Sequence, residues 1–373
     1  MSDERRDDDH VDVMQTIAES GRAALRAQNA ASPIVKRGIA LTPVKFGISF
    51  TATWFNQAGA LVHVYSDGSI QLNHGGTEMG QGLNTKVAQV VADEFGIALD
   101  RVKITATHTA KVPNTAPTAA SSGSDLNAMA AKIAARTIRD RMTAEAAKRL
   151  GCMSDEVRFS QGRVFGADGA MSFEELAKAC YLDRISLSST GFYRTPNITW
   201  DRPSKTGRPF FYFAYGASCS EVMIDTMTGE MKLVAVDILH DCGRSLNPAI
   251  DIGQIEGAFV QGLGWLTTEE LVFGPDGRLR THAPSTYKIP LASDVPREFN
   301  VRLATWSVNK EPAIGRSKAV GEPPICLAMS AVEALSMAVA SVADYKVPPQ
   351  LDMPATPERV LMAVQRMQKA VRA

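Results

Sequence analysis

HGGTEMGQGLNTKVAQVVADEF, residues His74–Phe95, places a glycine-rich loop directly before an apolar repeat. The repeat has helical spacing and predicts a helix with one buried face, formed by Leu83, Val87, Val90, Val91 and Phe95. Glycines ahead of a helix let backbone N–H groups approach an anion at the positive helix end. The glycine spacing is neither GxGxxG nor GxxxxGKS/T, so it does not indicate a nucleotide loop. A simple turn and an anion-binding loop explain this spacing equally well.

The regions around this helix alternate between hairpins and helices. Hairpins are predicted from Leu61–Tyr65 with Ser69–Asn73, and within Phe210–Leu239 with a turn at Thr228-Gly229. Further elements are a strand over Val102–Thr107 and helices over Val13–Gln28, Asp125–Lys148, Ile250–Gly262 and Ile325–Ala343. Antiparallel hairpins with separate helices predict an α+β fold, with mixed or antiparallel sheets and helices packed in two lobes.

The predicted domain organisation starts with a charged N-terminal segment and linker over residues 1–43. One domain then covers residues 44–373. A composition shift near Ser188–Pro209 divides it into lobes at about 44–195 and 196–373.

Composition argues against several classes of protein. Lys and Arg total 40, as do Asp and Glu, so no basic excess indicates nucleic acid or an anionic membrane as a partner. The five cysteines lack CxxC spacing, which indicates reduced thiols without an iron–sulfur cluster or structural zinc. We read neither a membrane span nor a secretory leader, and therefore expect a cytoplasmic protein.

Three further motifs carry polar groups that have both a structural and a functional explanation. In APTAASSGSD, Ala116–Asp125, the hydroxyls could donate to an anion, or Ser124 and Asp125 could only cap a helix. Gln254 and Gln261 share a helix face and could meet a heterocycle, although such amides are usually satisfied within the protein.

The third motif is GEPP, in which Glu322 stands between Gly321 and two prolines. This position indicates a helix start, where a carboxylate gains from the helix dipole. A partly buried carboxylate here would also make a general base. Histidine spacing does not indicate a metal held by protein ligands, and GxSxG is absent.

Five segments in order resemble the molybdenum-binding part of the xanthine dehydrogenases, in the molybdenum hydroxylase family. They are KFGISFTATWFNQAGALVHVY, HGGTEMGQGLNTK, KVPNTAPTAASSGSDLN, DIGQIEGAFVQGLGW and SKAVGEPPICLA. The resemblance runs from about Val44 to beyond Leu335 and implies the C-terminal half of a molybdopterin-binding domain.

The resemblance also implies roles for individual residues. Cofactor-binding residues would be Gly80, Gln81, Gly82, Thr118, Ala119, Ala120, Ser121 and Gln254, with Gln81 near molybdenum. Substrate-binding residues would be Phe50, Thr51, Ala119 and Ala120. Glu322 would be the catalytic base, and no side chain would ligate the metal directly.

The implied activity is oxidation of hypoxanthine and xanthine to urate with oxygen taken from water. The family's purine-orienting Glu and Arg, its iron–sulfur ligands and its flavin domain have no counterpart here. We therefore expect partners: the N-terminal half of the molybdenum subunit, and chains or domains that carry 2Fe-2S and FAD. The chain alone is expected to be inactive. Alternatives are a hydroxylase of another N-heterocycle or an aldehyde, and a non-catalytic pterin-binding or remnant chain.

Overall fold

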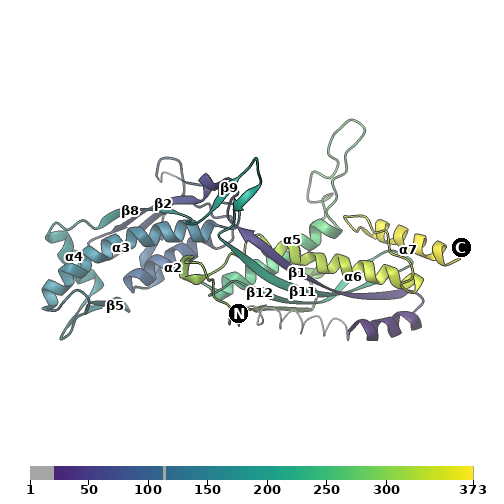
Figure 1. Cartoon of the computed structure of the whole chain (residues 1–373), viewed down its shortest axis with the longest axis horizontal. Coiled ribbons are helices and arrows are strands. Elements are labelled where there is room, and N and C mark those ends of the chain that lie inside the picture. Colours follow the sequence, from purple (N-terminus) through teal and green to yellow (C-terminus); the bar gives the residue numbers. More distant parts are fainter. Residues whose placement is uncertain (1–20, 112–114, 373) are drawn as a thin grey trace.

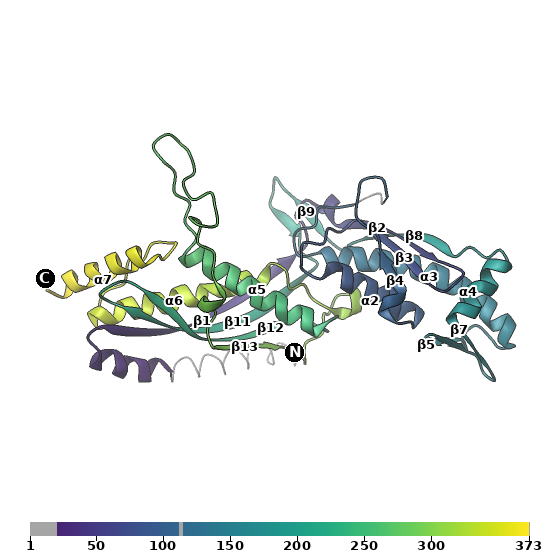
Figure 2. The same ribbon diagram turned by 180° about the vertical axis from the view of Figure 1, so that it is seen from behind.

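Two sheets, each with helices packed on it, lie end to end along the molecule (Figure 1). The computed structural model describes residues 21–111 and 115–372. The view from behind shows the same two lobes, with α2 and α3 in one and α5 and α6 in the other (Figure 2). The predicted α+β class, with mixed sheets and helices in two lobes, is confirmed.

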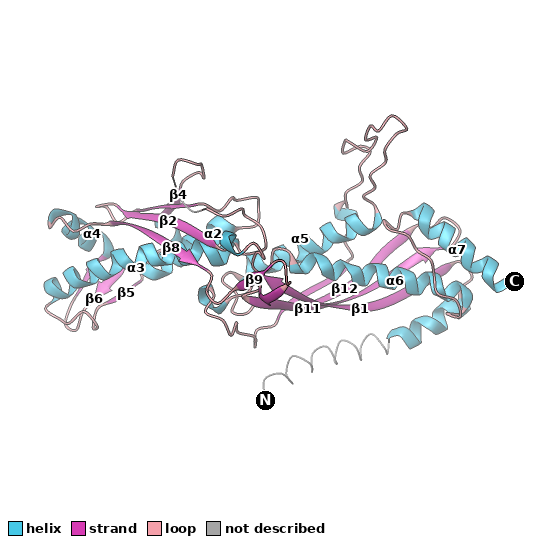
Figure 3. Ribbon diagram, turned by 45° about the horizontal axis from the view of Figure 1, so that its top comes forward, coloured by secondary structure: helices cyan, strands magenta, loops and turns pink. Residues whose placement is uncertain are grey.

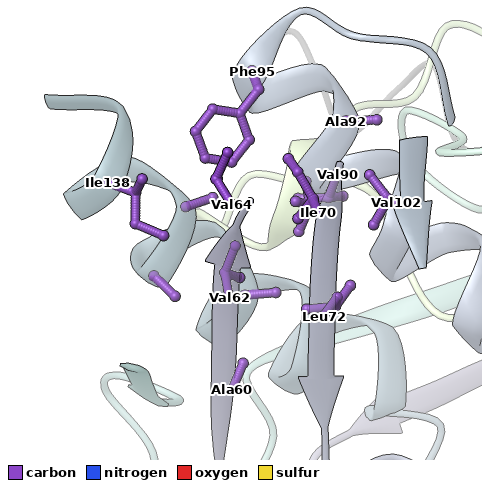
Figure 4. Packing of buried hydrophobic residues seen from close by; sticks show 14 of the residues in the cluster. Ala60, Val62, Val64, Ile70, Leu72, Val90, Ala92, Phe95, Val102 and Ile138 are labelled. Carbon is purple, nitrogen blue, oxygen red and sulfur yellow. The ribbon is translucent and has the colours of Figure 1, made fainter. Parts of the chain in front are cut away.

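The first lobe is built on a four-stranded sheet in the order β4-β3-β2-β8. Its strands are β2 (Gln57–Val64), β3 (Ile70–His74), β4 (Val102–Ile104) and β8 (Ser188–Arg194). Its helices are α2 (Leu83–Phe95), α3 (Gly123–Leu150) and α4 (Phe173–Leu182). Alternate residues of β2 and β3 point into the core, where Val62 and Leu72 are fully buried with Phe95 of α2 (Figure 4).

The second lobe is built on a sheet in the order β1-β11-β12-β13. Its strands are β1 (Val35–Ile48), β11 (Tyr212–Asp225), β12 (Met231–Asp241) and β13 (Glu298–Leu303). Its helices are α5 (Pro248–Thr267), α6 (Met329–Ala340) and α7 (Pro357–Arg372). Helices α5 and α6 lie along the sheet (Figure 3), and Phe259 and Leu335 are fully buried in this second core.

Smaller elements complete the chain. Two minor sheets contain β5 (Arg158–Ser160), β6 (Arg163–Phe165) and β7 (Ala170–Ser172), and β9 (Thr199–Asp201) with β10 (Thr206–Arg208). Short 3₁₀ helices are η1 (Thr53–Phe55), η2 (Leu99–Arg101), η3 (Ala292–Asp294), η4 (Ile314–Arg316), η5 (Pro323–Ala328) and η6 (Ser341–Ala343). Residues 21–31 are also helical.

Both lobes bring a helix unusually close to a strand. A side chain at Gly191 of β8 would overlap the carbonyl of Ala130 in α3. A side chain at Gly38 of β1 would likewise overlap the carbonyl of Ala334 in α6. This packing explains why α3 is rich in alanine, since small residues let helix and sheet backbones approach.

Most predicted elements are confirmed. Both hairpins form, and the helices over α2, α3 and α5 begin and end within five residues of the predicted limits. The strand predicted over Val102–Thr107 ends at Ile104. The helix predicted over Ile325–Ala343 is instead η5, α6 and η6 in succession.

The predicted linker over residues 1–43 is wrong for residues 35–43, which form part of a strand. Strand β1 starts at Val35 and pairs with β11 throughout, so residues 35–48 belong to the second lobe's sheet. Pro43 lies within β1, which is an edge strand, where a residue without N–H is tolerated. Residues 13–20 of the predicted Val13–Gln28 helix lie outside the described residues. The division near residue 195 falls between β8 and β9.

The segment Pro323–Ala343 is long and apolar enough to cross a membrane, with a mean hydropathy of 1.9. However, 56% of its most apolar 18-residue stretch is buried inside the protein, as in the core helix of a globular domain. The absence of a membrane partner stays a prediction.

Candidate functional site

A cavity of about 370 Å³ opens where the two lobes meet. Its walls come from the loops before α2 and α3, from α5 and from the segment 317–322. Six residues predicted from four separate motifs line it: Gln81, Thr118, Ala119, Ser121, Gln254 and Glu322.

Ser121 and Glu322 meet at the rim of this cavity. The Ser121 hydroxyl donates to Glu322 Oε2 at 2.9 Å and accepts from the Glu322 backbone N–H at 2.7 Å. Ala120 and Ser121 both have left-handed backbone angles, with φ of +53° and +54°. Such angles are strained for residues with a Cβ and commonly mark functional sites. Glu322 is exposed rather than partly buried as expected.

The glycine loop before α2 uses its own carboxylate to satisfy its amides. Glu78 Oε1 accepts from the N–H groups of Gly80 at 2.9 Å and Gly82 at 3.0 Å, and Oε2 accepts from Asn84 N–H at 2.9 Å. Burial acts to raise the pKa of Glu78, but these amide hydrogen bonds outweigh it and lower the pKa. Sequence reasoning missed this residue. Its signal was a carboxylate just before a helix start.

Gln81 lines the cavity, but its amide is bound within the same loop. Its Oε1 accepts from Met79 N–H at 2.5 Å, and its Nε2 donates to the Thr77 carbonyl at 2.8 Å. In this arrangement the Gln81 amide is not free to reach a ligand until one of those bonds breaks.

Five other predicted residues do not line the cavity: Gly80, Gly82, Ala120, Phe50 and Thr51. Phe50 lies after β1, where its N–H donates to Asn56 Oδ1 at 2.8 Å and its ring meets the Phe55 ring edge-on at 5.5 Å. Thr51 is exposed. The structure thus brings the predicted base together with part of the predicted cofactor set, and leaves the aromatic substrate residue outside. The roles assigned to all these residues stay predictions.

Buried charges lie beneath the cavity and were not predicted. Lys86 of α2 forms an ion pair with Asp251 of α5, with side chains 8% and 4% exposed. Asp251 also accepts from the Ser245 hydroxyl at 2.5 Å. This pair joins the two lobes. The sequence feature that could have predicted the pair was a charged residue inside each of two otherwise apolar helices.

Asp125, at the start of α3, is the second buried acid. It accepts a hydrogen bond of 2.6 Å from the Tyr212 hydroxyl. Burial raises the pKa of Asp125 to about 7, although the Tyr212 hydrogen bond and the charge of Lys86 oppose the rise. Asp125 was predicted to be at most a helix cap, and the structure places it in the cavity wall instead.

The groups in the cavity fit the molybdopterin that the resemblance implies. Within residues 21–111 and 115–372, the side chains of Gln254 and Ser124 line the cavity and bond no other protein group, so both can face a polar heterocycle. Small residues at positions 119, 123 and 321 leave backbone accessible. The same described ranges contain no cluster of three His, Cys, Asp or Glu side chains that could hold a metal ion.

Comparison with known proteins agrees with these observations. The chain is 49% identical over 331 residues to xanthine dehydrogenase/oxidase of Felis catus, an alignment covering 87% of this chain and 23% of that protein. It is 50% identical over 307 residues to xanthine dehydrogenase of Dictyostelium discoideum, covering 82% of this chain and 21% of that protein. The chain thus spans less than a quarter of these relatives.

Solved structures share the fold. Quinoline 2-oxidoreductase from Pseudomonas putida 86 superposes with a TM-score of 0.79 at 23% identity, over 94% of this chain and 44% of that chain. Reconstituted CO dehydrogenase from Oligotropha carboxidovorans superposes with a TM-score of 0.78 at 21% identity, over 98% and 45%. The model of the molybdopterin cofactor-binding domain family matches residues 13–296. The chain therefore belongs to the molybdopterin cofactor-binding domain family.

Proposed function

We propose that this chain supplies one half of the molybdenum-cofactor cavity of a purine hydroxylase. The assembled protein would oxidise hypoxanthine and xanthine to urate with oxygen from water. Support comes from the 49% identity to a xanthine dehydrogenase/oxidase and from coverage of under half of the matched solved chains. The remaining half, and carriers of 2Fe-2S and FAD, would be partner chains or domains, in the cytoplasm.

One observation carries this proposal. Gln81, Ser121, Gln254 and Glu322 are far apart in sequence and belong to both lobes, yet they line one cavity. A structural explanation of each motif alone, as a turn, a cap or a satisfied amide, does not account for this convergence.

The residues of this chain have separate tasks in the proposed reaction. The molybdenum cofactor, when bound, would supply the two-electron redox chemistry of the reaction. Glu322, as the general base, would accept the proton of the water-derived oxygen that attacks the substrate. It would do so at Oε1, because Ser121 already donates to Oε2. Gln254 and Ser124 would bind and orient the cofactor through side-chain polar groups that bond no other group in the described part of the chain. Exposure of Glu322 fits a site whose outer wall comes from another segment.

The decisive test is Glu322→Gln in the assembled enzyme, measured by stopped-flow reduction with xanthine. Loss of a general base typically slows the chemical step about 10²–10⁴-fold. The matched control is Glu333→Gln, the same change at an exposed glutamate of α6 outside the cavity, and it should leave the rate unchanged. Reduction of Glu322→Gln at the parent rate would sink the proposed mechanism. Faster reduction by quinoline or an aldehyde than by xanthine would reassign the substrate.

A further inference from the structure

The two lobes have separate main hydrophobic cores, although Ile314 and Leu246 of the second lobe pack against the first core. Around the cavity the lobes are also joined by polar contacts. The contacts include the Ser121–Glu322 hydrogen bonds at the rim and the Lys86–Asp251 ion pair below. Hydrogen bonds have preferred directions, so contacts of this kind can fix the relative orientation of two surfaces.

Tyr212 lies where these contacts meet. It is the first residue of β11 and is 6% exposed. Its hydroxyl donates to Asp125 Oδ2 at 2.6 Å and accepts from the Ala319 N–H at 3.0 Å. One buried hydroxyl therefore bonds both the start of α3 and the segment that leads to Glu322.

The same two segments are linked a second time at the rim. Asp125 follows Ser121 by four residues, and Ala319 precedes Glu322 by three. The rim hydrogen bonds between Ser121 and Glu322 are exposed, whereas the Tyr212–Asp125 bond is buried and the Ala319–Tyr212 bond is part-buried. A buried hydrogen-bond network is stronger and less mobile than one in water. The hydrogen bonds of Tyr212 can therefore keep Ser121 and Glu322 close enough to bond each other at the rim.

We infer that Tyr212 is a positioning residue, which holds the Glu322 segment against the loop of Ser121 through its hydroxyl. Tyr212 does not line the cavity, so it acts through Asp125 and Ala319, which do. The assignment of Glu322 as the base rests on the proposed function, but the positioning of the Glu322 segment by the hydrogen bonds of Tyr212 does not.

Amide hydrogen exchange of the full chain tests this link without cofactor or activity. Tyr212→Phe keeps the ring and removes both hydrogen bonds. We expect exchange at the Ala319 and Glu322 amides to become at least about tenfold faster, as loss of a buried hydrogen bond allows. Pro323 and Pro324 have no N–H, so peptides that end there report on few amides.

Tyr193→Phe is the matched control. Tyr193 of β8 is 9% exposed, and within the described residues its hydroxyl makes no hydrogen bond. The Ala319 and Glu322 amides of Tyr193→Phe should therefore exchange at the parent rate. Ser121→Ala should speed exchange at Glu322 alone. Faster exchange at Ala319 with an unchanged Glu322 amide in Tyr212→Phe would overturn the inference, because Tyr212 would then be only a local partner of Ala319.

Asp125 variants test the same link if Tyr212→Phe does not fold. Asp125→Asn keeps an oxygen that accepts from Tyr212, so exchange at Glu322 should stay within about twofold of the parent. Asp125→Leu removes the acceptor and should raise it at least about tenfold. Equal exchange in the two Asp125 variants would also overturn the inference.

Discussion

Replacement of Lys86 by Met should strongly destabilise the folded chain. The substitution keeps most of the side-chain volume but removes the charge that faces Asp251. The side chains of Lys86 and Asp251 are only 8% and 4% exposed, so water cannot replace the missing partner. The Ser245 hydroxyl still donates to Asp251, but it carries no charge. Leaving a buried carboxylate without its cation typically costs about 3–5 kcal/mol.

Urea unfolding followed by circular dichroism measures this cost, with two variants for comparison. Arg101→Met breaks a pair with Glu174 whose side chains are 37% and 47% exposed, and it should cost less than about 1 kcal/mol. The double variant Lys86→Met with Asp251→Leu removes both buried charges and should recover most of the loss.

The reasoning fails if Lys86→Met costs no more than Arg101→Met. It also fails if the double variant is less stable than Lys86→Met alone, because the loss would then come from packing rather than from an unpaired charge.

Two further predictions concern acids of the site. Because burial raises the pKa of Asp125 from 3.8 to about 7, the folded state binds a proton there that the unfolded state has released, and the contribution of Asp125 to stability should fall as pH rises from about 4 to about 7 and then level. Burial lowers the pKa of His240 to about 4, which contributes with the opposite sign, so the effect of Asp125 is the difference between variant and parent. Urea unfolding across this range should show that Asp125→Asn makes the slope of stability against pH more positive than the parent's by up to about 1.4 kcal/mol per pH unit, and a slope equal to the parent's would contradict the assignment. Glu78→Ala should lower stability by about 0.5–2 kcal/mol, since three amides at the start of α2 lose their acceptor. Glu78→Gln keeps one oxygen, so its melting temperature in thermal unfolding should fall between those of the parent and Glu78→Ala. An unchanged melting temperature in Glu78→Ala would refute the capping role.

The sequence was sufficient for elements whose signal is local. The apolar repeat from Leu83 to Phe95 and the turn at Thr228-Gly229 determine α2 and the β11–β12 hairpin within a few residues. Strand β1 was missed because its partner β11 is distant in sequence and Pro43 reads as a break. Its place at a sheet edge, which makes Pro43 tolerable, is a tertiary fact.

The residues of the candidate site likewise fall into those that the sequence predicted and those that only the fold brings together. The family resemblance, carried by motifs with glycine, proline or small residues, implied Gln81, Ser121 and Glu322, which share one cavity. Asp125 was predicted only as a possible helix cap, and Lys86 and Tyr212 were not predicted at all, because only the packing of two lobes makes these residues neighbours. Phe50 shows the converse, since its motif was clear but its position outside the cavity depends on the fold after β1.

The internal carboxylate of the glycine loop has a consequence for ligand binding. With Glu78 bonded to the amides of Gly80, Gly82 and Asn84, the loop has a defined conformation before any ligand arrives. A ligand that docks against it loses no further loop entropy, so association should resemble entry into a rigid receptor rather than folding upon binding. Gly80 and Gly82 allow the positive φ angles that this loop conformation needs, and the hydrogen bonds of Glu78 then hold the loop in that conformation.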